Sequence, residues 1–343
     1  MFAIIDCGTT NTRVYILDGN NKIIAQGSRK VGVRNTSMTG SKDALRAGVC
    51  EAIVEAVENA KISLKDLEFA IASGMITSEI GLIEIPHLVA PVGLDELAKG
   101  IESVPGGKIL PIDLPILFIR GIRNNYGDNA TLRDIRNVDF MRGEETQVIG
   151  ILEDLAITES VNIIVLSSHT KIIHADNNGK IVASLTTISG QLYEAILKET
   201  MIGKSLIENN VEQSGGYSFE EVVAIATEVV NEVGLDRCMM IPRFMQVLLN
   251  TDYNERNLFL NTGIAVDDMK IISEFERQGH TAKTFVLFGH ESRCKLYSYL
   301  LKQKYGSEIK VISVSDKEKL SELTVHGAVS IVNRHRELQK NLH

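Results

Sequence analysis

Apolar runs and amphipathic stretches follow one another along the chain in an order that occurs twice. The apolar runs of the first copy predict strands at residues 2–6, 12–18, 22–27 and 69–72. A polar turn at residues 18–21 joins the second of these strands to the third, as in a hairpin. Between the third and fourth strands, apolar residues recur at helical spacing over residues 42–60 and predict an amphipathic helix.

The second half of the chain repeats this order. Its apolar runs predict strands at residues 161–166, 171–175 and 180–186, and a helix begins near Ser189. Helices are then expected at residues 219–233, 237–250, 255–278, 292–304 and 322–338, with strands at 284–288 and 309–314. The two copies predict an α/β fold with two related lobes and a ligand in the cleft between them.

Composition limits the class of protein. The 343 residues are 44% hydrophobic, which is enough for two domains with large cores. A net charge of −8 argues against nucleic-acid binding, and no apolar run is long enough to span a bilayer. The first residues lack the basic region of a secretory signal, and the four cysteines lack the spacing of a metal site. We therefore expect a cytoplasmic protein with reduced thiols and with no nucleic-acid or membrane partner.

The first predicted strand ends on an acid that is followed by a turn of small residues. The sequence there is Asp6-Cys7-Gly8-Thr9-Thr10-Asn11-Thr12-Arg13. A buried acid is costly unless a cation pairs with it. The turn offers hydroxyls and backbone amides to phosphate oxygens, while the acid would organise Mg²⁺ directly or through water. The alternative is a hairpin with ordinary turn residues.

A dense group of charges precedes the apolar segment that starts at Val148. Asp139 is followed by Met141-Arg142-Gly143-Glu144-Glu145-Thr146-Gln147. If a helix starts near Gly143, both glutamates lie in its first turn, where carboxylates interact favourably with the helix dipole. That stabilising role is one interpretation. The other is a general base poised by Arg142, because a phosphoryl acceptor needs a carboxylate to take its proton.

Three further polar loops follow predicted strands. Ser167-Ser168-His169-Thr170-Lys171 offers hydroxyls, an imidazole and an ammonium to a transferring phosphate. Gly289-His290-Glu291-Ser292 lets a ligand approach the backbone at a helix start. The small residues of 73–81 would line a sugar pocket. For each of them the alternative is an ordinary surface loop.

The tripeptide Gly203-Lys204-Ser205 looks like the end of a phosphate-binding P-loop. The glycine that this motif requires five positions earlier is Lys198, and the preceding run predicts a helix rather than a strand. No G-x-G-x-x-G occurs either, so the dinucleotide-binding fingerprint is absent.

Three of these segments together resemble one known family. The N-terminal I-D-x-G-T-T-N-x-R, the central M-R-G-E-E-T-Q-x-I-G and the turn S-H-T-K-I-I-H-A-D are similar to the 2-keto-3-deoxygalactonate kinases (2-dehydro-3-deoxygalactonokinases). These enzymes belong to the actin-like superfamily of sugar kinases, which have two ribonuclease-H-like lobes. The similarity runs through nearly the whole chain in the right order. It implies ATP-dependent phosphorylation of the 6-hydroxyl of a 2-keto-3-deoxy sugar acid, in galactonate catabolism.

The resemblance also implies roles for individual residues. The metal ligand would be Asp6, which organises Mg²⁺. The ATP-binding residues would be Asp6, Gly8, Thr9, Thr10, Asn11 and Arg13 in the first lobe, and Ser168, His169, Lys171, Gly289, Glu291 and Ser292 in the second. The sugar acid would meet Gly74, Met75, Ser78, Glu79 and Arg142. The catalytic base would be Glu144, Glu145 or Asp139.

The lobes implied by this resemblance are residues 1–140, with the C-terminal helix at 322–343 packing back on them, and residues 141–321. The small-molecule sugar acid would be the partner in the reaction. Residues 100–138 are longer than we expect for the family and are candidates for an interface between copies in a homo-oligomer.

The chain departs from the family pattern at both binding loops. The usual second phosphate turn, P-G-T-H-x-K-W, is replaced by residues 166–172, and the loss of its glycine would hold the backbone off the phosphate. Glu79 stands where we expect Asn or Arg, and Leu82 stands where we expect Trp. An acid facing the pocket would repel a substrate carboxylate. Two alternatives therefore stay open: a kinase of a different sugar or sugar acid, and a non-enzymatic nucleotide-dependent sensor.

Overall fold

The computed structural model describes residues 1–208 and 215–341, and contacts between residues divide the chain into two units. Unit 1 consists of Met1–Ser160, His174–Ser184 and Glu318–His343, and unit 2 of Val161–Ile173 and Leu185–Lys317. The expected boundary at residue 140 therefore lies twenty residues too early, because the helix that follows it packs within unit 1. Of the C-terminal range 322–343, residues 342 and 343 lie outside the described residues.

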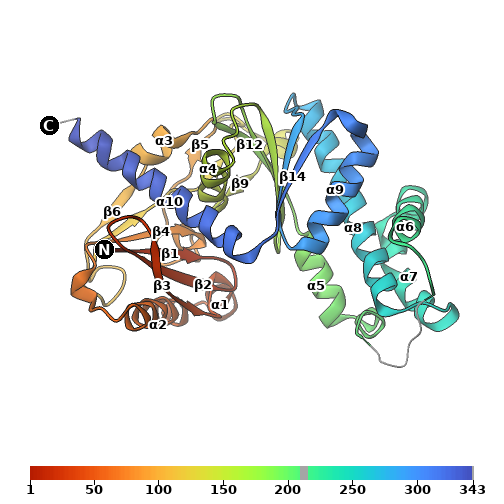
Figure 1. Ribbon diagram of the computed structural model, residues 1–343, viewed down its shortest axis with the longest axis horizontal. Helices are drawn as coiled ribbons and strands as arrows, with labels where there is room; N and C mark the ends of the chain where they lie inside the picture. The colour runs from red at the N-terminus through yellow and green to blue at the C-terminus, as the bar shows by residue number, and fades with distance from the viewer. Residues whose placement is uncertain (209–214, 342–343) are drawn as a thin grey trace. The chain divides into compact units, whose positions relative to one another are not determined.

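A six-stranded sheet forms the centre of unit 1 (Figure 1). Its order is β3 (Ile23–Arg29), β2 (Thr12–Leu17), β1 (Phe2–Cys7), β4 (Ala70–Gly74), β7 (Ile116–Phe118) and β6 (Glu102–Val104). The central strand β1 pairs antiparallel with β2 and parallel with β4. Its run of apolar residues is uninterrupted because a central strand is covered on both faces.

Helix α2 (Asp43–Ala60) packs on this sheet, and further helices of unit 1 lie around it. These are α1 (Val33–Thr39), α3 (Leu94–Lys99), α4 (Glu144–Asp154) and α10 (Lys317–Lys340). The contact of α2 with β3 is so close that a Cβ on Gly27 would lie 2.3 Å from the carbonyl oxygen of Ala52. The pattern of apolar residues predicted α2 but not α1, which has only seven residues and therefore shows no apolar stripe. A helix near Gly143 was considered because of the charges there, and α4 begins there.

The second sheet repeats the strand order of the first. It runs β12 (Ile181–Thr187), β11 (Thr170–Ala175), β10 (Val161–Leu166), β13 (Thr284–Gly289) and β14 (Lys310–Val314). Strand β10 pairs parallel with β13, and β13 pairs parallel with β14. Since β3-β2-β1-β4-β7 has the same order, the predicted duplication is confirmed, and each sheet has the ribonuclease-H-like arrangement.

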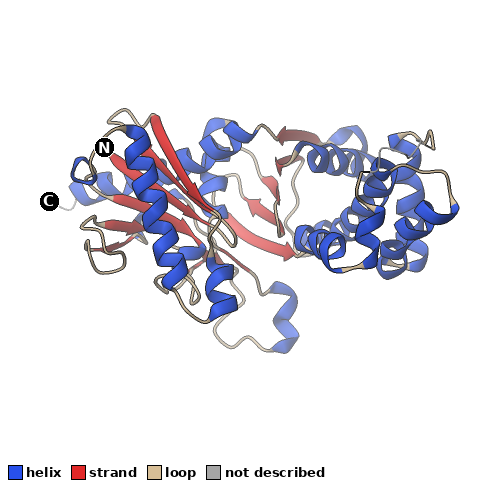
Figure 2. Cartoon of the chain, turned by 90° about the horizontal axis from the view of Figure 1, so that it is seen from below, coloured by secondary structure: helices blue, strands red, loops and turns tan. Residues whose placement is uncertain are grey.

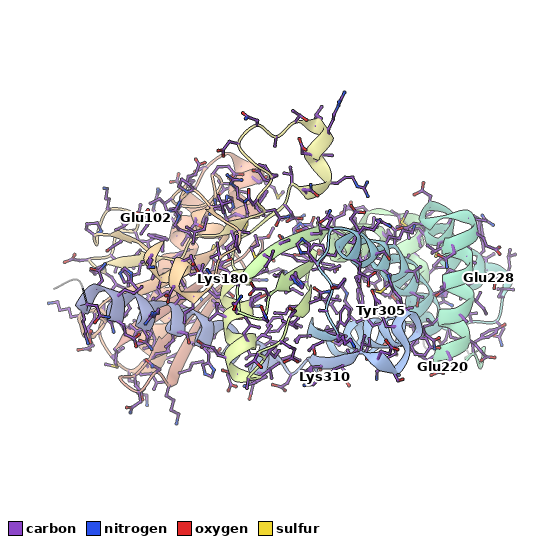
Figure 3. The ribbon with its side chains drawn as sticks, turned by 90° about the horizontal axis from the view of Figure 1, so that it is seen from above. Glu102, Lys180, Glu220, Glu228, Tyr305 and Lys310 are labelled. Atoms are coloured by element: carbon purple, nitrogen blue, oxygen red, sulfur yellow. The ribbon has the colours of Figure 1, made fainter. Side chains whose placement is uncertain are left out.

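Unit 2 adds its own helices. They are α5 (Ser189–Glu199), α6 (Phe219–Val233), α7 (Leu235–Leu248), α8 (Tyr253–Arg277) and α9 (Glu291–Tyr305). Figure 2 shows α6, α7 and α8 packed together apart from the strands. The guanidinium of Arg256 is fully buried in this region, where it donates hydrogen bonds to the carbonyl oxygens of Ser205 and Thr251. Outward-facing acids on α6, such as Glu220 and Glu228, contribute to the negative net charge (Figure 3).

Very short elements lead into the central charged motif. Strands β5 (Leu88–Val89), β8 (Ile122–Arg123) and β9 (Phe140–Met141) form a small sheet just before α4. With two residues each, they have no periodicity that a sequence pattern could reveal. The tripeptide at residues 203–205 lies in a 3₁₀ turn, Met201–Ser205, that follows helix α5. It is therefore not a P-loop, which needs a strand before it.

Two absences concern the described residues only. No helix within residues 1–208 and 215–341 is long and apolar enough to cross a membrane. All four cysteines are described, and each is a free thiol.

Candidate active site

The acid at the end of β1 lies next to a cation and a second acid. Asp6 is opposite Arg13 in the β1–β2 ladder, and the Arg13 guanidinium approaches its carboxylate to 3.4 Å. Burial raises the pKa of Asp6, the charge and hydrogen bond of Arg13 oppose this rise, and the charge of Glu144 adds to it. When both are ionised, Asp6 and Glu144 carry two negative charges, whereas Arg13 supplies one positive charge. A bound cation would favour the ionised form of both carboxyl groups.

The turn after β1 is supported from behind by helix α1. Within the turn, the Gly8 amide donates to the Asn11 carbonyl at 2.9 Å. The first amides of α1, those of Val33 and Arg34, donate to the carbonyls of Gly8 and Thr9 at 3.3 and 2.9 Å. A Cβ on Gly32 would lie 2.5 Å from the Gly8 carbonyl oxygen, so only glycine allows this contact. The carbonyls are thereby turned inward to α1, while the side chains of Thr10 and Asn11 are exposed.

The end of β4 and the start of α4 converge on the same place. A Cβ on Gly74 would lie 2.6 Å from the Cys7 carbonyl oxygen, and one on Gly143 would lie 3.3 Å from the Gly74 Cα. Both glycines have a positive φ, +89° and +110°, which other residues rarely adopt. These backbone contacts bring the first turn of α4 to the end of β1.

The two glutamates of this first turn have different surroundings. Glu145 is fully buried, and both of its carboxylate oxygens accept a hydrogen bond from the Gly143 amide, at 2.8 and 2.7 Å. Burial raises the pKa of Glu145 to about 8, with a further contribution from the charge of Glu144. Glu144 is half-buried, and its charge acts on both Asp6 and Glu145. Glu144 is therefore the more accessible of the two glutamates.

Arg142 fixes the loop that follows β4. Its guanidinium donates to the Thr77 hydroxyl and to the Ile85 carbonyl, both at 2.8 Å. Burial lowers the pKa of Arg142, and the charge of Glu145 opposes this effect. In the same loop, the buried Ser78 hydroxyl donates to the Met75 carbonyl, whereas Glu79 is exposed.

Asp139, the third candidate for the base, has contacts of another kind. Its carboxylate accepts a hydrogen bond from the Ser184 hydroxyl at 3.2 Å. Its backbone carbonyl accepts one from the Asn124 amide at 2.9 Å, and the Asn124 side chain in turn bonds to the Ser184 backbone. These contacts place Asp139 in the framework that joins β8 to β12.

The second polar turn, in unit 2, is also supported from behind by a helix. The Gln191 amide in the first turn of α5 donates to the Ser168 carbonyl at 2.8 Å. A Cβ on Gly190 would lie 2.2 Å from the Ser167 carbonyl oxygen. Here a cation is added: Arg293 of α9 donates to the Ser167 carbonyl at 2.7 Å and to the Thr170 hydroxyl at 2.8 Å.

The remaining residues of this turn are oriented by local contacts. The Ser167 hydroxyl donates to the carbonyl of His169 at 2.9 Å. The side chain of Lys171 is buried, and its ammonium donates to the Thr186 hydroxyl at 2.5 Å. Lys171 is therefore not the solvated lysine of an ordinary turn.

The loop after β13 forms the start of α9. A Cβ on Gly289 would lie 2.6 Å from the Leu166 carbonyl oxygen, so β10 and β13 touch at their ends. His290 caps the helix, because its Nδ1 accepts a hydrogen bond from the Ser292 amide at 3.4 Å. Glu291 and Ser292 are exposed at this helix start.

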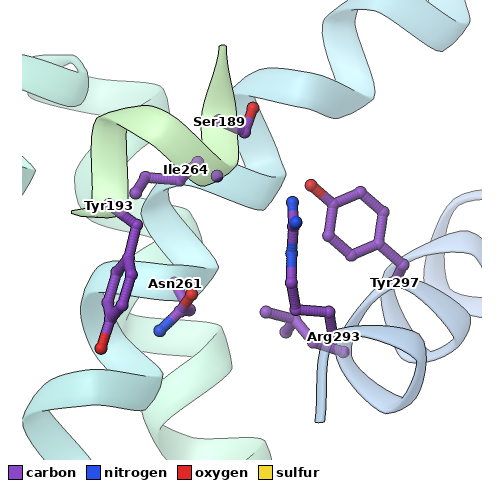
Figure 4. A pocket seen from close by; sticks show the side chains of 8 residues that line it. Ser189, Tyr193, Asn261, Ile264, Arg293 and Tyr297 are labelled. Carbon is purple, nitrogen blue, oxygen red and sulfur yellow. The ribbon is translucent and has the colours of Figure 1, made fainter. Parts of the chain in front are cut away.

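A pocket lies within unit 2 beside this helix (Figure 4). Its lining comes from α5, α8 and α9: Ser189, Gly190, Tyr193, Asn261, Ile264, Arg293, Leu296 and Tyr297. Asp268 accepts hydrogen bonds from the Ser189 hydroxyl and the Tyr297 hydroxyl, which fixes two sides of the pocket. Arg293 lies beside the Tyr297 ring and belongs both to the pocket and to the second polar turn.

The donor set near Asp6 suits Mg²⁺ better than a metal held by protein ligands alone. Among residues 1–208 and 215–341, no group of three or more His, Cys, Asp or Glu side chains is placed to hold a metal ion. Mg²⁺ usually keeps several waters and binds one or two carboxylates together with substrate phosphates. Asp6 with its incompletely balanced negative charge fits this kind of binding.

Sequence patterns missed several residues of these sites. Gly32 and Gly190 each allow a helix to contact a polar turn, and Arg293 anchors the second one. The two glycines follow their turns at nearly the same distance in the chain, so a residue-by-residue alignment of the two halves would have revealed them. No sequence signal marks Arg293, since nothing in the sequence shows which side of α9 faces the turn.

Comparison with known proteins shows the family. The model of the 2-keto-3-deoxy-galactonokinase family matches residues 6–322. A Rhizobium meliloti (strain 1021) protein, provisionally named 2-dehydro-3-deoxygalactonokinase DgoK1, is 23% identical over 227 residues. The alignment covers 66% of this chain and 66% of that protein, slightly less than two thirds of its length.

Solved structures share the fold. The crystal structure of a Sinorhizobium meliloti protein, provisionally named a 2-dehydro-3-deoxygalactonokinase, has a TM-score of 0.71 at 19% identity and covers 96% of each chain. A reductive activator for a corrinoid, iron–sulfur protein has a TM-score of 0.51 at 11% identity, over 98% of this chain and 62% of that one. The fold is that of the actin-like ATPases and sugar kinases. Because the family model matches nearly the whole sequence, this chain belongs to the 2-keto-3-deoxy-galactonokinase family, a family of sugar-acid kinases.

Proposed function

We propose that this chain transfers the γ-phosphoryl group of ATP to the 6-hydroxyl of 2-keto-3-deoxygalactonate in the presence of Mg²⁺. The observation that carries the proposal is the convergence of Asp6, the turn at residues 8–11 and Glu144 within a chain that belongs to this kinase family. Phosphoryl transfer needs little covalent help from a protein, so positioning and charge account for most of the catalysis.

Glu144 is the general base in this proposal. A base must be accessible to the acceptor hydroxyl and close to the phosphate site. Glu144 is half-buried and interacts with Asp6, whereas Glu145 is fully buried with both oxygens bonded to the Gly143 amide. Asp139 is engaged with Ser184 and is the weakest of the three candidates.

Glu145 and Arg142 are positioning residues. Glu145 closes the first turn of α4 through its bonds to Gly143. Arg142 holds the loop after β4 through Thr77 and Ile85, and this loop carries Met75, Ser78 and Glu79. Together they set where an acceptor hydroxyl would lie relative to Glu144.

Asp6 would hold Mg²⁺ through water, with Arg13 beside it. When bound, this ion would neutralise charge on the β- and γ-phosphates. In unit 1, the amides of Thr9, Thr10 and Asn11 and the hydroxyls of Thr9 and Thr10 would bind these phosphates next to Gly8, whose own amide bonds to Asn11. In unit 2, we propose Ser168, His169 and Lys171 as phosphate-binding residues.

The pocket of unit 2 would take the nucleoside of ATP. Tyr193 and Ile264 offer apolar surface, while Ser189, Asn261 and Arg293 offer polar groups, as small-molecule sites commonly do. Gly289, Glu291 and Ser292 would lie near the adenosine, at the start of the helix that carries Arg293.

One observation favours a second candidate, a kinase of a neutral sugar. Glu79 is exposed on the loop proposed for the sugar acid, and the nearby Leu82 is buried and apolar. An acid in this place would disfavour a carboxylate substrate and would tolerate a neutral one.

The test is an assay of ATP consumption over 2-keto-3-deoxy sugar acids, aldonic acids and neutral sugars, with the product mass measured. A phosphorylated product from 2-keto-3-deoxygalactonate alone supports the proposal. A product from neutral sugars alone supports the second candidate. No product from any of them, with ATP still bound, would leave the sensor as the better account.

Two variants test which of the two glutamates is the general base. Glu144→Gln should lower kcat by at least roughly a hundredfold with ATP binding retained. Glu145→Gln keeps the bond from the Gly143 amide and should lower kcat much less. The reverse order would make Glu145 the base. Loss of ATP binding in Glu144→Gln would instead give Glu144 a structural or metal-related role.

A further inference from the structure

Helices α4 and α10 of unit 1 touch through their backbones. A Cβ on Gly150 of α4 would lie 1.9 Å from the Leu323 carbonyl oxygen and 3.2 Å from the Gly327 amide nitrogen. A Cβ on Gly327 of α10 would lie 1.8 Å from the Thr146 carbonyl oxygen and 2.8 Å from the Gly150 amide nitrogen. The two glycines are thus reciprocal, because each one makes room for the backbone around the other.

Glycine weakens a helix interior, so its presence at both sides of one crossing needs a reason. Close approach of two backbones supplies one, since no other residue leaves this space. Thr146, which Gly327 contacts, lies in the first turn of α4, and its hydroxyl and amide bond to the Gly143 carbonyl. Helix α10 therefore contacts the same turn of α4 that carries Glu144 and Glu145.

Polar contacts hold α10 against α4 beyond this crossing. At the far end of α4, Asp154 accepts hydrogen bonds from the Lys319 ammonium at 3.0 Å and from His326 Nδ1 at 3.1 Å. The Ser330 hydroxyl donates to the Glu153 carboxylate at 2.5 Å. Figure 1 shows α10 running past α4 toward α3, where Arg334 pairs with Asp95 at 2.6 Å.

The geometry points to Gly327 and Gly150 as positioning residues of the proposed phosphoryl transfer: the C-terminal helix sets the position of Glu144 by direct backbone contact with α4. This inference rests on the proposed function for its kinetic consequence. A displacement of α4 by about 1 Å would move the base away from the acceptor hydroxyl and lower the rate up to roughly a hundredfold. The proposed ATP-binding groups lie on other elements, those of unit 1 at the ends of β1 and β2 and those of unit 2 around α5 and α9, so ATP binding should change little.

The main test is Gly327→Ala with Gly27→Ala as the matched control. The control also adds a Cβ against a backbone carbonyl of unit 1, at 2.3 Å, but between β3 and α2, which carry none of the proposed site residues. Both variants should lose stability. Gly327→Ala, assayed well below its unfolding temperature, should lose roughly tenfold to a hundredfold in kcat with the KM for ATP within about twofold. Gly27→Ala should keep its kcat.

Equal kcat losses in the two variants would overturn the inference, as would an unchanged kcat in folded Gly327→Ala. If Gly327→Ala does not fold, Asp154→Asn replaces it, with Glu337→Gln on the outer side of α10 as its control. Asp154→Asn weakens only the bonds to Lys319 and His326 and should lower kcat about threefold without changing the KM for ATP. An unchanged kcat there would overturn the inference.

Amide hydrogen exchange separates this inference from the proposed function. Gly327→Ala should lose protection at the amides of residues 147–150, which face the carbonyls of the first turn of α4, relative to Gly27→Ala, whatever the substrate of the enzyme is. A wild-type chain that phosphorylates nothing overturns the proposed function, and the exchange pattern still decides the role of Gly327. Unchanged protection at these residues would contradict that role.

Discussion

The two polar turns of the molecule, at residues 8–11 and 167–170, have the same supporting structure and different charges. In each, a turn after the first strand of a ribonuclease-H-like sheet rests on the start of a helix, and a glycine allows the contact. Behind the second turn, Arg293 donates to the Ser167 carbonyl and the Thr170 hydroxyl. Beside the first turn, the dominant charge is the Asp6 carboxylate.

Under the proposed function, this difference leads us to expect different contributions from the two turns. The first turn supplies a carboxylate that suits a cation, while the second is stiffened by a fixed cation of its own. The second turn lacks the glycine of the family pattern. Its carbonyls accept hydrogen bonds from Arg293 and Gln191, which hold the turn in position. We therefore expect variants of the two turns to fail in different ways.

The largest effect should come from the first turn. Asp6→Asn removes the charge proposed to hold Mg²⁺ and should lower kcat by a hundredfold or more, roughly several kcal/mol of transition-state stabilisation. Steady-state kinetics over a range of Mg²⁺ concentrations would measure it. Near-normal turnover in this variant would rule out the role of Asp6 with the metal.

A variant of the second turn should weaken the binding of ATP rather than lower the turnover of bound ATP. Arg293→Gln removes charged hydrogen bonds from the turn and a wall of the pocket, and should raise the KM for ATP roughly tenfold to a hundredfold. Lys295→Gln is the matched control, because Lys295 is a cation of the same helix that lies over the ring of Phe219. An equal effect in both variants would show that the charge of α9, and not its contact with the turn, matters.

A pH effect on stability should come from the helix beside the first turn. Burial raises the pKa of Glu145 to about 8, so the folded chain keeps a proton there that the unfolded chain releases near pH 4.5. Its contribution therefore lowers stability as pH rises from about 4.5 to about 8, and the decline stops above that. Urea unfolding at several pH values should show Glu145→Gln gaining on the wild type over this window, by at most about 1.4 kcal/mol per pH unit.

The matched control for this pH effect is Glu58→Gln, the same substitution on the exposed side of α2. Parallel pH curves for Glu145→Gln and the wild type would mean that Glu145 is ionised in the folded chain.

The smallest effect should come from the ion pair beside Asp6. Arg13 is half-exposed and its guanidinium lies 3.4 Å from the carboxylate, a geometry that contributes little to stability. Arg13→Gln should change the free energy of unfolding by less than about 1 kcal/mol. A larger loss would show that Arg13, rather than a metal, is the main countercharge of Asp6.

The order of the longer strands and helices along the chain could be predicted from the sequence because their apolar patterns are long. The start of α4 at Glu144 followed from the charges next to Gly143. The strands of two or three residues and the short helices α1 and α3 were missed, since a pattern of that length has no measurable period. The unit boundary was also missed, because it depends on the packing of α4 with α10, and this packing depends on Gly150 and Gly327.

The candidate site shows the same limit. Motif residues such as Asp6, Arg142 and Glu144 could be named from the sequence, but their division of roles could not. Whether Glu144 or Glu145 is buried depends on the direction of the first turn of α4, which Gly74 and Gly143 fix through backbone contacts. Arg293 enters the site only through the placement of α9.

The most direct test of the account is the product of the reaction itself. The purified chain is incubated with ATP, Mg²⁺ and 2-keto-3-deoxygalactonate, and the product is examined by ³¹P NMR with coupling to the sugar protons. The account predicts one phosphate ester, coupled to the protons on carbon 6 and formed in step with ADP. ADP formation without an ester, or an ester at another carbon, would contradict it.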